Sequence, residues 1–205
     1  MKPLAILGAS GHGKVVADTA QQCGWEPIHF YDDLWPTQKG IEDWPIVGNT
    51  ATLLAQGSHY TGILVAIGDN PVRLHKTRQI QQAQHPLTVL IHPTAYLAAH
   101  TVLGLGSIVC AGAIVQPGTT IGTASIINTS ASVDHDCQLA DGVHISPGAH
   151  LAGNITVGEN SWIGIGASIK HNITIGTHVT IGAGAAVIAD VPNHTNVVGV
   201  PARPI

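Results

Sequence analysis

Hydrophobic residues recur at every sixth position through the second half of the chain. An aliphatic residue stands at each of these positions from Ile91 to Val187, and a mostly small residue stands two places before each one. A period of six fits neither an amphipathic helix nor an alternating strand. It fits a coil of three short strands, in which three hexads close one coil and neighbouring coils lie ~4.8 Å apart. The pattern therefore predicts about five stacked coils.

Turn residues follow many of the aliphatic positions. Glycine stands directly after six of them, and Asn128 and Asp134 occupy the same place in two other hexads. These residue types tolerate the backbone angles of tight turns, so we expect them to provide those angles here. Cys137 falls in a small inward position and Cys110 in a turn position, and neither is expected to act as a nucleophile.

The first 90 residues follow a different pattern, in which short apolar runs alternate with amphipathic stretches. The predicted strands cover residues 4–7, 27–30 and 61–67, and the predicted helices cover residues 14–23 and 71–84. Alternation of strand and helix indicates a parallel sheet. The sequence therefore predicts a small Rossmann-like α/β domain over residues 1–90 and the coil domain over residues 91–205.

A glycine-rich segment joins the first predicted strand to the first predicted helix. It reads Gly8-Ala9-Ser10-Gly11-His12-Gly13, and backbone N–H groups in such a segment are suited to an anion. The spacing is not that of the dinucleotide fingerprint, and a tight turn that merely needs glycine explains it equally well. Asp32 and Asp33 follow the second predicted strand, where acids suit a ribose or base edge.

Composition narrows the class of partner. The net charge is −4 with 8 Lys+Arg, which argues against broad nucleic-acid binding. No apolar run is long enough to span a bilayer, and the short apolar start does not form a signal peptide. Three cysteines without paired spacing fit a reducing compartment. We therefore expect a cytoplasmic protein with a small-molecule ligand.

The repeats and the glycine-rich segment together carry a resemblance. The repeats resemble those of the hexapeptide acyltransferases, which form left-handed parallel β-helices. With Asn128-Thr129-Ser130, Asp134-His135-Asp136 and the closing segment 198–203, the chain is similar nearly end to end to the sialic acid O-acetyltransferase and UDP-sugar N-acetyltransferase family. The type it most resembles acetylates the C4 amine of UDP-4-amino-4,6-dideoxy-N-acetylglucosamine, in bacillosamine synthesis for glycans and protein glycosylation. The resemblance implies acetyl-CoA as co-substrate, no metal, and a homotrimer with acetyl-CoA between neighbouring β-helices.

His135 is the candidate general base. It lies two residues after the inward Val133 and is flanked by two acids. Neutral imidazole removes a proton near neutral pH, and an adjacent carboxylate orients the ring. The resemblance assigns the base to His135 and its support to Asp136, where the family has the longer Glu. The alternative is a surface histidine in a polar turn, which holds for most of the 13 histidines.

The resemblance implies further contacts with both substrates. It places His144 beside the thioester, Asn128 where it positions the thioester, and the Gly153 N–H near the acetyl oxyanion. The full set expected to contact acetyl-CoA is Asn128, His144, Gly153, Ile165, Ala183, Lys170 and Arg203, the last two through phosphates. The set expected to contact the nucleotide sugar is Ser10, Gly11 and His12 at the pyrophosphate and sugar, and Asp32 or Asp33 at the uracil.

Four other functions compete with this interpretation. The first is O-acetylation of sialic acid by the same chemistry. The second is a metalloenzyme of the γ-carbonic anhydrase kind, because His135 and His171 are two coils apart; Gly176 stands where the third ligand is needed and His178 comes too late. The third is a non-catalytic binding protein. The fourth is a nicotinamide oxidoreductase, for which a 90-residue domain leaves little room.

Overall fold

The N-terminal part of the chain forms a five-stranded sheet with helices around it. The computed structural model describes residues 2–205. The strand order is β3-β4-β2-β1-β5, parallel throughout except that β3 runs antiparallel to β4. The elements are β1 (Leu4–Leu7), α1 (Gly11–Gln22), β2 (Ile28–Tyr31), β3 (Gly40–Ile41), β4 (Trp44–Gly48), α2 (Thr50–Gln56), η1 (Gly57–His59), β5 (Gly62–Val65) and α3 (Asn70–Gln82). All the elements predicted for residues 1–90 are present. The sequence did not predict β3, β4, α2 and η1, because no hydrophobic periodicity marks them.

Helix α1 begins at Gly11, three residues before the predicted start at Lys14. Gly11, His12 and Gly13 are therefore helical. Two of the three glycines have a structural reason: a Cβ on Gly13 would lie 3.0 Å from the Phe30 ring, and Gly8 has a φ of 112°. A Cβ on Gly11 would meet nothing within 4 Å. Gly8 and Gly13 would therefore be needed even without a ligand.

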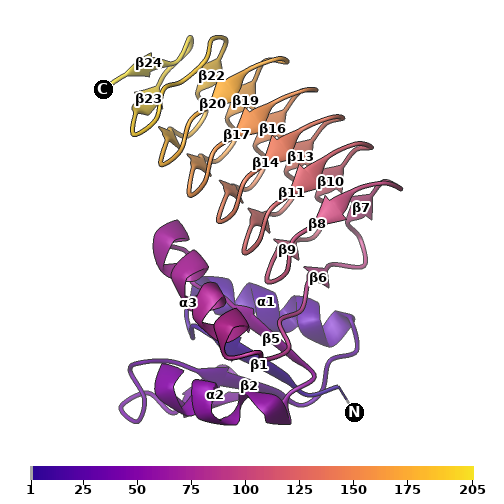
Figure 1. Cartoon of the computed structure of the whole chain (residues 1–205), viewed down its shortest axis with the longest axis vertical. Coiled ribbons are helices and arrows are strands. Elements are labelled where there is room, and N and C mark those ends of the chain that lie inside the picture. The colour runs from indigo at the N-terminus through magenta and orange to yellow at the C-terminus, as the bar shows by residue number, and fades with distance from the viewer. Residues whose placement is uncertain (1) are drawn as a thin grey trace.

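The second half of the chain is a β-helix with three faces, as the hexads predicted (Figure 1), and it is left-handed, as the resemblance implied. The first face contains β6 (Leu90–Ile91), β9 (Ile108–Val109), β12 (Ile126–Ile127), β15 (His144–Ile145), β18 (Trp162–Ile163), β21 (Thr180–Ile181), β23 (Asn196–Val198) and β24 (Arg203–Pro204). The second contains β7 (Tyr96–Leu97), β10 (Ile114–Val115), β13 (Ser132–Val133), β16 (His150–Leu151), β19 (Ser168–Ile169) and β22 (Ala186–Val187). The third contains β8 (Val102–Leu103), β11 (Thr120–Ile121), β14 (Gln138–Leu139), β17 (Thr156–Val157) and β20 (Thr174–Ile175).

The second residue of each short strand points into the prism. Every strand from β6 to β22 ends on a predicted aliphatic residue, and from Val109 onward these residues are almost fully buried. Each such side chain contributes about 1.5–3 kcal/mol through removal from water. The coils are in register, so that a residue pairs with the one 18 positions later, as Ile126 does with His144.

The role predicted for the glycines after the aliphatic positions is wrong. Positive φ angles occur two residues further on, as at Ser130 and Asp136, and not at these glycines. A Cβ on Gly158 would instead lie 2.5 Å from the backbone nitrogen of Thr177 in the next coil. Glycine is needed there because consecutive coils approach each other closely, not because the turn requires unusual angles.

The α/β domain packs against the N-terminal coils of the first face, at β9 and β12. Ile108 and Ile126 share a buried cluster with residues of β1, β2 and α1. Cys110 belongs to the same cluster and begins the turn after β9, since its carbonyl accepts the Ala113 N–H at 3.2 Å, as predicted. Burial raises the pKa of its thiol to about 12. Cys137 is buried inside the prism, as predicted. The chain termini lie at opposite ends of the long axis (Figure 1).

Candidate active site

His135 lies at the edge between the second and third faces, in the turn between β13 and β14. Its Nδ1 is 2.8 Å from Oδ2 of Asp136, and the two side chains are 65% and 67% exposed. A carboxylate oxygen accepts a hydrogen bond, so the neutral imidazole carries its proton on Nδ1. The Nε2 lone pair therefore remains free to accept a proton.

Two glycines on neighbouring coils make room for this pair. A Cβ on Gly153, one coil later, would lie 2.5 Å from both Cε1 and Nε2 of the His135 ring. A Cβ on Gly118, one coil earlier, would lie 2.5 Å from Oδ1 of Asp136. The imidazole and the carboxylate thus occupy space that side chains at these two positions would fill. The sequence placed Gly153 beside His135 correctly; Gly118 was missed, although the same 18-residue spacing leads to it.

His144 lies on the first face, on β15, and is only 8% exposed. Its ring stacks on Trp162 with centroids 5.6 Å apart and planes at 3°. The Asn128 amide nitrogen is 3.1 Å from His144 Nε2, while Oδ1 of Asn128 accepts the Thr129 N–H at 2.8 Å. This arrangement makes Nε2 the acceptor and leaves the proton on Nδ1. That Nδ1 is buried and has no hydrogen-bond partner among the described residues.

His12 and Arg73 complete a buried polar cluster with His144 between the two domains. Burial, together with the charge of Arg73, lowers the pKa of His12 to about 4 and that of His144 to about 3. Both imidazoles are therefore neutral near pH 7. Nε2 of His12 is also buried without a partner among residues 2–205. His12 is therefore close enough to Arg73 and His144 for their charges to affect one another's pKa.

Arg73 joins the two domains and carries no signal in the sequence. From α3 it donates to the carbonyl oxygens of Ala124 (2.8 Å) and Gly142 (2.9 Å) in the β-helix. It also donates to the carbonyls of Ile67 and Gly68 and to the Asn70 side chain, at 2.8–3.1 Å. Desolvation lowers the pKa of Arg73 to about 10, so it remains charged at neutral pH. A buried cation with five acceptors fixes the angle between the domains.

A cavity of about 290 Å³ lies at the carboxyl ends of the parallel strands. Its walls are Leu7, Gly8, Ser10, Asp32, Asp33, Ile67 and Gly68. The structure thus brings Ser10 together with both acids, whereas Gly11 and His12 are not among the lining residues.

Both acids of this cavity are already engaged by the chain. Asp32 accepts the Ala9 N–H at 2.8 Å. Asp33 accepts the Thr50 N–H at 2.9 Å and pairs with Lys76 at 3.1 Å. Partial burial acts to raise the pKa of Asp33, but these partners outweigh it and hold the pKa below its ordinary value. The remaining lone pairs of the carboxylates are those available to a base or ribose.

The other predicted residues fall into two groups on the prism. Gly153 and Lys170 lie on the edge that carries His135, between the second and third faces. Ile165 and Ala183 lie one coil apart on the edge between the first and second faces. Arg203 lies on β24, where its Nη1 donates to the carbonyl of Ala202. In a three-sided prism the first face is opposite the His135 edge, so a single chain does not bring His144 and His135 together.

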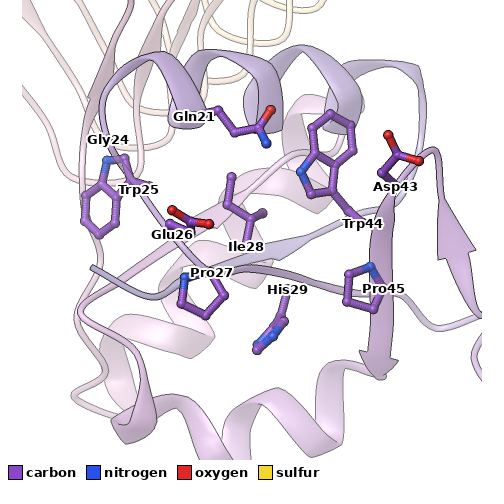
Figure 2. A pocket seen from close by; sticks show the side chains of 10 residues that line it. All are labelled: Gln21, Gly24, Trp25, Glu26, Pro27, Ile28, His29, Asp43, Trp44 and Pro45. Carbon is purple, nitrogen blue, oxygen red and sulfur yellow. The ribbon is translucent and has the colours of Figure 1, made fainter. Parts of the chain in front are cut away.

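A cavity of about 440 Å³ opens at the other end of the parallel strands (Figure 2). Its lining is Gln21, Gly24, Trp25, Glu26, Pro27, Ile28, His29, Asp43, Trp44 and Pro45. It contains none of the predicted site residues. Within residues 2–205, no three His, Cys, Asp or Glu side chains gather as a metal site would require. No helix in the same range has the length and apolar character to cross a membrane.

Comparison with known proteins gives a consistent set of relatives. Residues 3–80 match the PglD N-terminal domain family, and residues 154–189 match the bacterial transferase hexapeptide (six repeats) family. UDP-N-acetylbacillosamine N-acetyltransferase of Bacillus subtilis (strain 168) is 37% identical over 113 residues, which are 54% of this chain and 52% of that protein. The match thus spans about half the length of this curated relative.

Solved structures of related proteins match the whole chain. The acetyltransferase domain of PglB from Neisseria gonorrhoeae FA1090, in complex with acetyl coenzyme A, has a TM-score of 0.96 and 43% identity, over 100% of this chain and 99% of that one. PerB from Caulobacter crescentus, in complex with CoA and GDP-perosamine, has a TM-score of 0.94 and 34% identity, over 100% and 98%.

Proposed function

The chain belongs to the family of hexapeptide-repeat sugar N-acetyltransferases with a PglD-type N-terminal domain, and we propose that it acetylates the C4 amine of a UDP-4-amino-4,6-dideoxy-N-acetylhexosamine. The acetyl donor is acetyl-CoA. The observation that carries the proposal is the exposed His135–Asp136 pair, which leaves a basic Nε2 free at the surface of the β-helix. The relatives named for bacillosamine and perosamine chemistry support a nucleotide-linked amino sugar as acceptor.

The reaction is a direct transfer. The neutral sugar amine attacks the thioester carbonyl and forms the C–N bond, while Nε2 of His135 takes the proton that the amine loses. The developing imidazolium is stabilised by Asp136 at 2.8 Å. Backbone N–H groups, with that of Gly153 as the candidate, stabilise the tetrahedral oxyanion. The C–S bond then breaks, CoA leaves as thiolate, and the proton on His135 neutralises it.

The placement of the residues supports a site shared between copies of the chain. His135 and Gly153 lie on one edge, and Asn128 and His144 lie on the opposite face. Both groups can contact the same thioester only if the edge with His135 and Gly153 comes from one copy and the face with Asn128 and His144 comes from another. We therefore propose a cyclic homotrimer with one site at each interface, in the cytoplasm, and no metal in the reaction.

The test is steady-state turnover with acetyl-CoA and either the UDP-amino sugar or sialic acid. His135→Ala should lower kcat at least ~100-fold, with the oligomer unchanged in size-exclusion chromatography. His171→Ala is the matched control, because His171 is exposed on the same edge two coils later and should leave kcat unchanged. Near-normal turnover by the His135 variant would remove it from the mechanism, and acetylation of sialic acid alone would replace the proposed acceptor.

A further inference from the structure

Trp162 presents a large apolar ring at the surface of the first face. It lies on β18, one coil beyond His144, and is 47% exposed. Its Nε1–H donates to the hydroxyl of Ser146, and one side of its ring is covered by the stacked imidazole of His144. An indole fixed by a hydrogen bond and a stacking partner cannot turn away from its position. Its uncovered side is therefore a rigid, preformed apolar surface.

That surface forms one wall of a cavity of about 220 Å³. The β-helix contributes Trp162 together with His178 and Thr180, and the opposite wall is residues 69–71 at the start of α3. Asp69 faces this space and is exposed. Its Oδ1 accepts the Val72 N–H at 2.9 Å as the cap of α3, which leaves Oδ2 available to a ligand.

This cavity and the one at the glycine-rich segment are lined by consecutive residues of the chain. Ile67 and Gly68 line the first cavity, and residues 69–71 line the second. Both cavities thus share one short loop between β5 and α3. A nucleotide in the first cavity would carry its pyrophosphate past this loop and place the attached sugar in the second.

We propose that Trp162 is the platform on which the hexose of the nucleotide sugar stacks, with Asp69 accepting a hydrogen bond from a ring hydroxyl or amine. This inference rests on the proposed function for the identity of the substrate. A pyranose has a face of C–H groups that packs on an aromatic ring, and its polar groups lie around its rim. An indole floor with a carboxylate at its side matches that distribution. The platform makes Trp162 a specificity-determining residue that contacts the sugar and not acetyl-CoA.

Steady-state kinetics with the UDP-amino sugar and acetyl-CoA test the platform. Trp162→Ala should raise KM for the UDP-amino sugar about tenfold, and by a larger factor than KM for acetyl-CoA, which it affects only through the stacked His144 ring. Trp162→Phe should restore most of the loss, because it keeps an aromatic face. Trp44→Phe is the control, since Trp44 lies in the cavity of Figure 2 and should change neither constant. An unchanged KM for the sugar, or a raised KM for acetyl-CoA alone, overturns the inference.

Tryptophan fluorescence gives an independent readout of binding. Titration with the UDP-amino sugar should quench the wild type and Trp44→Phe, and the quench should be absent in Trp162→Phe. UDP alone and CoA alone should give no Trp162-dependent change; such a change from either overturns the inference. A wild type that acetylates no nucleotide sugar refutes the proposed function, whereas normal acetylation with Trp162-independent binding refutes only the platform.

Discussion

Acidification from pH 7 to pH 5 should destabilise the folded chain through His12 and His144. Their pKa values in the folded state, about 4 and about 3, lie below the unfolded value of 6.5. Between these values the unfolded chain binds more protons than the native one. The stabilisation is therefore present above pH 6.5 and is lost as the pH falls toward the folded pKa values. The loss at pH 5 is about 2 kcal/mol for each histidine, or about 4 kcal/mol together.

His144→Gln isolates one of the two contributions. A glutamine oxygen can still accept from Asn128, and the variant cannot be protonated. The variant should lose about 2 kcal/mol between pH 7 and pH 5, half the loss of the wild type. Urea unfolding at pH 7, 6 and 5, at one protein concentration, measures both losses. His75→Gln is the control, because His75 is exposed on α3 and should keep the wild-type loss. Equal losses in wild type and His144→Gln would refute the reasoning.

Two further substitutions test the geometry of the site and of the domain interface. Gly153→Ala should lower kcat at least ~10-fold, because the new methyl group would displace the His135 ring. The free energy of unfolding should change by less than ~1 kcal/mol. An unchanged kcat would show that catalysis does not require the His135 ring to lie over residue 153. Arg73→Met should lower the free energy of unfolding by about 3–5 kcal/mol, because it leaves five acceptors without their donor. Urea unfolding measures this, and a loss below ~1 kcal/mol would contradict the assigned role.

The β-helix was predictable because its signal is local and repeated. Each strand needs one inward aliphatic residue, so the hexads located every strand from β6 to β22. The same arithmetic makes residues 18 apart neighbours, and it predicts that Gly153 lies beside His135, as the structure shows. The turn glycines were misjudged because spacing gives the position of a glycine and not the reason for it. Close approach of coils and positive φ both select glycine.

The interface between the domains was not predictable from the sequence. His144 occupies an outward position of its hexad. It is nevertheless buried, because the α/β domain covers the N-terminal coils of the first face. Arg73 contacts carbonyls 51 and 69 positions away in the chain, so no local motif announces it. Helix α1 begins earlier than its apolar pattern indicates, because two glycines and a histidine form its first turn.

The strict register of the coils has a consequence for length variation. Gain or loss of a single hexad between Val133 and Ile169 would rotate the following residues to a different face. Such a change would move every later side chain by a third of a revolution, and between His135 and Gly153 it would separate these two residues. Variants of this domain that gain or lose strands should therefore differ in steps of 18 residues, so that each later strand stays on its own face.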